Sequence, residues 1–187
     1  MSSEPVIRRE LRPGDLGAII AYHGELYGRE YGVNSEFEEM VATAVGRAGE
    51  RGFPSEGEAI WIVELEGRHA GSIALTNEGD GLAMLRWVTL DPELRGRGLG
   101  RRLISEAIEA ARARGYSMVA LETFSDLRAA AQIYRSFGFE IVWEDTRPRW
   151  GRASITYQRY ELSFQVRAQS SSAISAGSSV RPFSVSA

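Results

Sequence analysis

The sequence of 187 residues contains no cysteine and only two histidines, His23 and His69. Without cysteine the chain can form no disulfide, no thiolate nucleophile and no cysteine-ligated metal site. Two histidines are also too few for a histidine cluster with zinc spacing. We therefore expect no bound metal, with His23 serving as a buried structural histidine and His69 exposed to solvent.

Long apolar runs and an excess of positive charge are also missing. No apolar stretch approaches the ~20 residues that a membrane-spanning helix needs, and the first residues, MSSEPVIRREL, lack the apolar core of a signal peptide. A net charge of −3 argues against a uniformly basic surface for nucleic acid. We expect a cytoplasmic protein without membrane or nucleic-acid partners: one domain over residues 1–165, then a Ser/Ala-rich C-terminal tail over 166–187.

What the sequence does contain is a regular succession of apolar patterns. Alternating and buried runs predict strands, and apolar positions three and four apart predict amphipathic helices. The predicted order is β-α-α-β-β-β-α-β-α-β-β. This order indicates an α/β (α+β) fold, with a mixed, mostly antiparallel sheet of about seven strands and helices on both faces.

Polar residues predict where the helices begin. Asp15 can cap the first helix, and Ser35 with Glu38 forms a capping box for the second. Ser125 or Asp126 is expected to cap the last helix. The segment TRPRWGRA, residues 146–153, is predicted to be a loop between the two closing strands.

The stretch DPELRGRGLGRRL, residues 91–103, places three glycines and four arginines between a strand and an amphipathic helix. Glycines at a helix start leave backbone N–H groups open to a bulky anion, and several such hydrogen bonds outweigh the helix dipole. A phosphate or pyrophosphate is the expected ligand. The run lacks the Lys-Ser/Thr ending of a P-loop, and its G-x-G-x-G spacing follows antiparallel strands rather than opening a Rossmann unit. The alternative is a solvated, arginine-rich helix start.

The same residues resemble a known family. RGRGLG, residues 95–100, is similar to the R/Q-x-x-G-x-G/A signature of GNAT-type N-acetyltransferases. LETFSDLRAAAQIYRSFGFE, residues 121–140, resembles that family's fifth strand and fourth helix, which end in a Y-x-x-x-G-F pattern. The resemblance covers roughly residues 6–164. RPGD and LYGREYG near the N-terminus are also similar to the acetyltransferase half of bacterial MarR–acetyltransferase fusion proteins, here expected without the DNA-binding part.

The resemblance implies a GNAT fold and acetyl-CoA (coenzyme A) as co-substrate. It implies that the end of the strand preceding the glycine run pairs with the acyl-carrying arm, and that the loop and helix start bind the pyrophosphate. A small polar residue before the last helix would add one contact. The implied cofactor-binding residues are Val88, Thr89, Leu90, Arg95, Gly96, Arg97, Gly98, Leu99, Gly100, Arg101 and Ser125.

The implied reaction is direct attack of an amine on the thioester in a ternary complex. The Val88 N–H is expected to stabilise the developing oxyanion, and Tyr134 to protonate the leaving thiolate. Glu122 is the first candidate for the general base, followed by Glu25 and Glu30. The alternative for each carboxylate is an ordinary solvated or structural role, and packing alone could explain Tyr134.

The sequence departs from the family pattern at two positions. Met84 stands where the histone-type branch has a glutamate, and Leu127 stands where an asparagine often contacts the cofactor. Ser125 or Asp126 would have to replace that contact. These departures keep open a catalytically inactive acyl-CoA-binding module as an alternative function.

Aromatic residues mark the expected acceptor side. Tyr27 and Tyr31 in the first helix and Trp150 near the last strand are the implied substrate-binding residues, with Tyr22 and Arg149 close to them in sequence. Such residues suit the amine of an apolar or aromatic small molecule. They could equally belong to the core or to the surface of a homodimer. Acetylation of protein lysines or N-termini is a further alternative.

Overall fold

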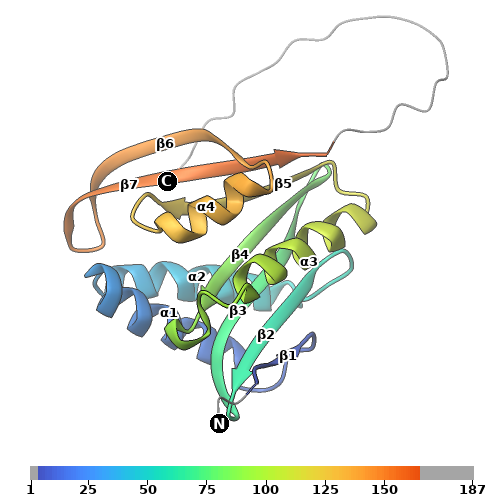
Figure 1. Ribbon diagram of the computed structural model, residues 1–187, viewed down its shortest axis with the longest axis horizontal. Coiled ribbons are helices and arrows are strands. Elements are labelled where there is room, and N and C mark those ends of the chain that lie inside the picture. Colours follow the sequence, from blue (N-terminus) through green and yellow to red (C-terminus); the bar gives the residue numbers. More distant parts are fainter. Residues whose placement is uncertain (1–3, 165–187) are drawn as a thin grey trace, which may run out of the picture.

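The computed structural model describes residues 4–164, in which seven strands form one mixed sheet of order β1-β2-β3-β4-β5-β7-β6 (Figure 1). All neighbouring strands run antiparallel except β4 and β5, which are parallel. The predicted tail at 166–187 lies outside the described residues. The strands are β1 (Val6–Arg8), β2 (Ala59–Leu65), β3 (Arg68–Gly79), β4 (Leu82–Leu90), β5 (Met118–Phe124), β6 (Glu140–Arg149) and β7 (Arg152–Ser163).

Helices cover both faces of the sheet and bury two separate apolar cores. The helices α1 and α2 pack on one face, where Ile19, Val41 and Ile62 are buried, and α3 and α4 pack on the other. The element order and the two-sided cover confirm the predicted fold class; a short 3-10 helix, η1, was not predicted. The helices are α1 (Asp15–Tyr31), α2 (Ser35–Glu50), η1 (Pro92–Leu94), α3 (Leu99–Ala113) and α4 (Arg128–Ser136). None of those within residues 4–164 has the length and apolar character needed to cross a bilayer.

The parallel strands β4 and β5 separate halfway along their length. They pair only from Leu82↔Met118 to Leu85↔Leu121, although both strands continue further. A bulge interrupts β4 beyond this point: Trp87 has a φ of 51°, and the Ser72 hydroxyl donates a hydrogen bond of 2.6 Å to the Trp87 carbonyl. The sheet therefore has a gap between the ends of β4 and β5, held open by the bulge.

Two predicted helix starts are wrong by one residue. Gly14 is the N-cap of α1, and the Asp15 carboxylate instead accepts hydrogen bonds from the buried Arg8 guanidinium and the Arg12 N–H. Arg8 needs such a partner because an unpaired buried charge is costly. For α2, Asn34 rather than Ser35 is the N-cap, and its side chain accepts from the Glu36 N–H.

The predicted cap of α4 and the predicted loop at 146–153 are also corrected. Leu127 is the N-cap of α4 and provides no side-chain hydrogen bond, whereas the Asp126 carboxylate pairs with Arg152. Cross-strand pairing extends β6 to Arg149 and β7 back to Arg152, so the turn consists only of Trp150 and Gly151. Both turn residues have positive φ, which suits a tight hairpin.

His69 is not the solvated side chain that was expected. Both of its ring nitrogens are buried and have no hydrogen-bond partner within residues 4–164. The ring packs edge-on against Tyr22, with centroids 5.2 Å apart. Its position next to a turn suggested exposure, but α1 covers this end of β3.

Candidate active site

Two cavities meet at the gap between β4 and β5. The first, of about 400 Å³, extends toward α3 and α4, and we call it the α3-side cavity. The second, of about 220 Å³, extends toward α2 and the β6–β7 hairpin, and we call it the α2-side cavity. Both are lined by Tyr27, Val88, Leu127 and Tyr134. A group bound on one side can therefore meet a group bound on the other at these four residues.

The glycine run forms one wall of the α3-side cavity. Gly98 is the N-cap of α3 with a φ of 78°, and no side chain caps the helix. Gly96 has a φ of 75°, so both positions favour glycine over residues with a Cβ. The first N–H groups of a helix have no partner within it. The uncapped start of α3 therefore offers backbone donors and the positive end of a helix dipole to an anion.

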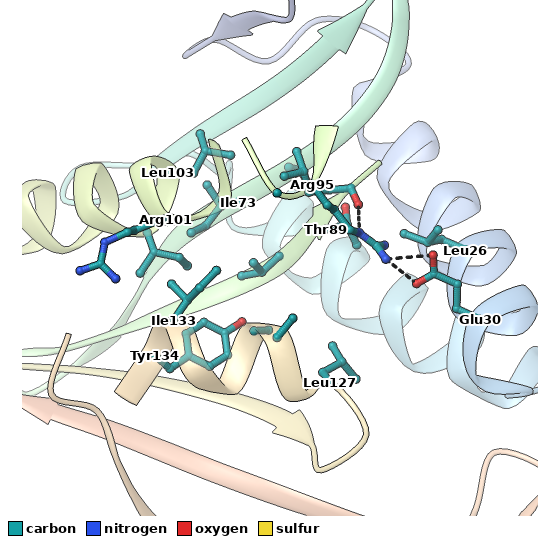
Figure 2. Close-up of a pocket in the computed structure, with 18 of the residues that line it drawn as sticks. Leu26, Glu30, Ile73, Thr89, Arg95, Arg101, Leu103, Leu127, Ile133 and Tyr134 are labelled. Atoms are coloured by element: carbon teal, nitrogen blue, oxygen red, sulfur yellow. Dashed lines mark hydrogen bonds and ion pairs between the residues drawn. The ribbon is translucent and has the colours of Figure 1, made fainter. Parts of the chain in front are cut away.

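The polar side chains that line the α3-side cavity differ in whether they already have hydrogen-bond partners. The Thr89 hydroxyl is buried without a hydrogen-bond partner in the described chain. Arg95, by contrast, donates to both carboxylate oxygens of Glu30 at 3.0 Å and to the Leu90 carbonyl at 3.0 Å (Figure 2). Glu30, one of the candidate bases, thus lies in an ion pair at the α3-side cavity.

Most of the predicted cofactor-binding residues come together in this cavity. Arg97, Leu99 and Ser125 are not among its lining residues: Arg97 and Ser125 are exposed, and Leu99 packs against the core. Ile133 and Leu103, which were not predicted to bind the cofactor, also line the cavity and contribute apolar surface. The predicted residues that do line the cavity are Val88, Thr89, Leu90, Arg95, Gly96, Gly98, Gly100 and Arg101.

Tyr134 lies on α4 with its hydroxyl directed into the α3-side cavity (Figure 2). The side chain is buried, and its ring packs against Phe139 and Tyr160 with centroid distances of 6.0 and 5.9 Å. The hydroxyl makes no hydrogen bond to any part of the described chain. Burial raises the pKa of this phenol, so it stays protonated at neutral pH and holds a proton at the place where the cavities meet.

The backbone of Val88 faces the gap. Neither Trp87 nor Val88 has a partner residue in the strand register, because the bulge displaces them from β3 and β5 has already diverged. The Tyr27 hydroxyl donates to the Val88 carbonyl at 3.2 Å. This contact fixes the peptide next to the Val88 N–H, which is the predicted oxyanion donor.

Aromatic rings form the walls of the α2-side cavity. Trp150 is buried there against Phe37 and Phe124, with ring centroids 4.9 and 5.7 Å away. The Trp150 carbonyl accepts a hydrogen bond of 3.0 Å from the Asn34 N–H, which ties the hairpin to the α1–α2 connection. Tyr27 also lines this cavity as predicted. Tyr31 does not: one turn further along α1, it lines the α3-side cavity instead.

Glu122 is the single carboxylate among the lining residues of the α2-side cavity within the described chain. It accepts hydrogen bonds from the Tyr157 hydroxyl at 3.1 Å and from Arg159 at 3.4 Å, and it remains open to solvent. Glu25 is exposed and lines neither cavity. Tyr22 also points elsewhere, since its hydroxyl donates to Asp91.

His23 is buried as predicted, but it also lines the α2-side cavity. Sequence reasoning treated it as purely structural. The sequence spacing could have indicated this cavity position, because His23, Tyr27 and Tyr31 lie four residues apart on one face of α1. That face runs from one cavity to the other. Met84, which stands where the histone-type branch has a glutamate, lines the same cavity.

Comparisons with known proteins identify the family of this chain. The model of the acetyltransferase (GNAT) family matches residues 23–139. The uncharacterized N-acetyltransferase YjgM of Escherichia coli (strain K12) is 33% identical over 141 residues, which cover 74% of this chain and 83% of YjgM. N-acetylaspartate synthetase of Danio rerio is 33% identical over 115 residues, covering 59% of this chain but only 39% of that protein. The match thus spans less than half of the synthetase.

Solved structures share the fold at low sequence identity. An N-acetyltransferase from Staphylococcus aureus Mu50 has a TM-score of 0.64 at 18% identity, covering 86% of this chain and 99% of its own. The structure of yncA from Salmonella typhimurium with its cofactor acetyl-CoA has a TM-score of 0.64 at 19% identity, covering 91% and 100%. These similarities confirm the predicted fold.

Proposed function

This chain belongs to the GNAT family of acetyltransferases, and we propose that it transfers an acetyl group from acetyl-CoA to the primary amine of a small molecule by direct attack in a ternary complex. Family membership makes it an acyltransferase. The donor, the acceptor and the mechanism are the parts that we propose.

One observation carries the proposal: the two cavities share Tyr27, Val88, Leu127 and Tyr134 at the gap between β4 and β5. Direct transfer requires donor and acceptor to be bound at the same time with their reacting atoms in contact. Two cavities that meet at the Val88 backbone N–H and the Tyr134 hydroxyl supply that arrangement without a covalent enzyme intermediate. The chain also has no cysteine that could carry the acyl group.

The residues of the α3-side cavity fit acetyl-CoA. The uncapped start of α3 with Gly96 and Gly98 can take a pyrophosphate through backbone N–H groups. The unpartnered Thr89 hydroxyl can bond to a polar group of the acyl-carrying arm. Acetyl-CoA supplies the activated acetyl thioester and the thiolate leaving group.

Three groups of this chain would then act in the reaction: one hydrogen-bond donor, one acid and one base. Val88 donates its backbone N–H to the acetyl carbonyl oxygen as negative charge develops on it. Tyr134 donates its phenolic proton to the sulfur as the C–S bond breaks. Glu122 removes a proton from the incoming amine, directly or through water, because an amine with a pKa near 10.4 is almost fully protonated at neutral pH.

The acceptor cavity favours a small aromatic or apolar amine. Its volume is about 220 Å³ and its walls include Tyr27 and Trp150, so a ring or short alkyl chain can bury apolar surface there. Acetylation of a peptide N-terminus or a protein lysine is the alternative, and it predicts that peptides are acetylated faster than small amines.

A cytoplasmic location, a homodimer and the likeness to MarR fusion proteins stay predictions.

The test is an amine panel with acetyl-CoA in which free coenzyme A thiol is followed with a disulfide dye. Since the protein has no cysteine, the dye detects no protein thiol. We expect thiol release with small aromatic primary amines, and the acetylated amine in the mass spectrum. Thiol release at the hydrolysis rate with every amine and peptide would contradict the proposal.

A further inference from the structure

The His23 ring lines the α2-side cavity and has one nitrogen that is free to accept a hydrogen bond. Its side chain is only 4% exposed, and Nδ1 lies 2.7 Å from the carbonyl oxygen of Ile19. A carbonyl can only accept, so Nδ1 carries the hydrogen and Nε2 of the neutral ring carries a lone pair. This second nitrogen has no hydrogen-bond partner within residues 4–164.

The ring stays neutral and is held in one orientation. Burial lowers the pKa of His23 to about 4, so the Nε2 lone pair is present throughout the neutral range. The ring stacks on Tyr27 at a centroid distance of 5.7 Å and an interplanar angle of 10°. The Tyr27 hydroxyl in turn donates to the Val88 carbonyl. His23 is thereby fixed relative to the gap where the acetyl group would be attacked.

Resting on the proposed acetyl transfer, we propose that His23 Nε2 accepts a hydrogen bond from the attacking amine nitrogen and thereby makes the enzyme selective for primary amines. Once a bound amine displaces water from the α2-side cavity, an acceptor left without a partner is costly, and the amine N–H would satisfy it. The contact would also direct the nitrogen lone pair toward the thioester carbon.

The proton count explains the selectivity. A neutral primary amine has two hydrogens on nitrogen. As the N–C bond forms and the C–S bond breaks, the thiolate receives the Tyr134 proton, and one amine hydrogen leaves as a proton that returns Tyr134 to its neutral form through water. The other hydrogen remains on the product amide, and this is the hydrogen held by His23. A secondary amine must lose its single hydrogen, so His23 would be left without a donor during transfer.

His23 is thus assigned a role different from that of Glu122. Glu122 is a carboxyl group open to solvent, so it can pass a proton to water. His23 is buried and neutral, and it holds the nitrogen without taking its proton. The hydrogen-bond contact would make His23 a determinant of specificity, since a site built to bond an N–H rejects an analogue that lacks it.

The test compares kcat/KM for 2-phenylethylamine, its N-methyl derivative and 2-phenylpropan-1-amine. The last two are isomers, but only the last is a primary amine, so the pair separates the effect of the missing hydrogen from that of methyl bulk. We expect the wild-type protein to prefer the primary isomer by about tenfold or more, the value of one hydrogen bond to a buried acceptor. His23→Phe, which keeps a ring on Tyr27, should reduce this preference to about twofold or less. His23→Gln, which retains an acceptor, should restore most of it.

An equal preference in wild type and His23→Phe, or no preference in wild type, would overturn the inference while leaving the acetyl transfer itself intact. A loss of thiol release with every amine would instead overturn the proposed function. If His23→Phe does not fold, nitrogen NMR of the wild-type protein tests the contact directly. Only two histidines contribute imidazole signals to the spectrum. Adding 2-phenylethylamine with coenzyme A should shift the His23 Nε2 resonance and leave that of His69 in place; an unchanged His23 signal at saturation contradicts the contact.

Discussion

At the residue scale, the Tyr134 hydroxyl combines two properties that a proton donor to a thiolate needs. It is a buried phenol whose pKa is raised by burial, so it is fully protonated at neutral pH. It also makes no hydrogen bond to the described chain, so no contact must break before it turns toward a bound sulfur. Packing against Phe139 and Tyr160 involves the ring alone. The catalytic and the structural roles of Tyr134 can therefore be separated by removing one oxygen atom.

Tyr134→Phe should lower kcat by about 100-fold, the lower end of what a general acid contributes. Stability and acetyl-CoA affinity should change little, because the ring and its contacts remain. Steady-state kinetics with isothermal titration of acetyl-CoA measures both quantities. A loss of affinity equal to the loss of kcat would show that Tyr134 is a packing residue of the cavity and not the acid.

Glu122→Gln should lower kcat/KM most at neutral pH, where the amine arrives protonated and needs a base. The deficit should shrink as the pH approaches the amine's own pKa, near 10.4, because the amine then enters neutral. A pH profile of both proteins between pH 6.5 and about 10 tests this. Glu25→Gln, an exposed carboxylate that lines neither cavity, is the matched control and should follow the wild-type profile. A deficit of constant size at every pH would exclude Glu122 as the base.

At the scale of elements, the glycine turn before α3 and the glycine turn between β2 and β3 form a matched pair. Gly98 and Gly67 have φ values of 78° and 77°, and a Cβ at either position would meet no other atom within 4 Å. Alanine at each should destabilise the fold by a similar amount, about 1 kcal/mol, from the left-handed backbone alone. Only Gly98→Ala should also weaken acetyl-CoA binding, because only Gly98 caps the helix that faces the α3-side cavity.

Urea unfolding and acetyl-CoA titration of the two variants separate these effects. Equal acetyl-CoA affinity in Gly98→Ala and Gly67→Ala would mean that the start of α3 does not bind the cofactor. A lower affinity in Gly67→Ala would point to a general loosening of the sheet.

The order of helices and strands could be predicted because apolar periodicity is strong in most of them. The boundaries were less predictable, because tertiary contacts decide them. Asp15 looks like a cap in sequence but binds the buried Arg8, and Asp126 pairs with Arg152 rather than capping α4. The residues 146–153 have the composition of a loop, yet pairing between Thr146 and Thr156 and between Arg149 and Arg152 keeps most of them in strands.

At the scale of the whole molecule, His23 links folding to pH. Burial lowers its pKa to about 4 in the folded protein, whereas an unfolded histidine titrates near 6.5. Between these values the unfolded chain binds more protons, so stability must fall as the pH falls. The protein should be about 2 kcal/mol less stable at pH 5 than at pH 7 through His23 alone. The pKa of His69 is also lowered by burial and adds to the same trend.

Urea unfolding at pH 5 and pH 7 measures this loss, and His23→Phe should remove about 2 kcal/mol of it. Asp15 and Asp91 contribute little in this window, because hydrogen bonds from Arg8 and Arg68 outweigh burial and hold the pKa of both carboxyls below their usual value. An unchanged pH dependence in His23→Phe would show that the ring can be protonated in the folded protein.

The residues that line the α3-side cavity could be predicted from the sequence far better than those that line the α2-side cavity. The glycines and arginines at 95–101 are contiguous, so their local spacing already indicates the glycine-rich, uncapped helix start that lines the α3-side cavity. The α2-side cavity is assembled from distant segments: His23 from α1, Phe37 from α2, Glu122 from β5 and Trp150 from the hairpin. Only folding brings them together, which is why Tyr31 was assigned to this side and the cavity role of His23 was missed.

The central claim is that acetyl transfer takes place in the gap between β4 and β5, where the two cavities meet. A crystal structure with acetyl-CoA tests it most directly. We predict the pyrophosphate at the start of α3, the acetyl carbonyl oxygen within hydrogen-bond distance of the Val88 N–H, and the sulfur next to the Tyr134 hydroxyl. A thioester bound elsewhere, with its carbonyl away from Val88 and no path to the α2-side cavity, would contradict the account.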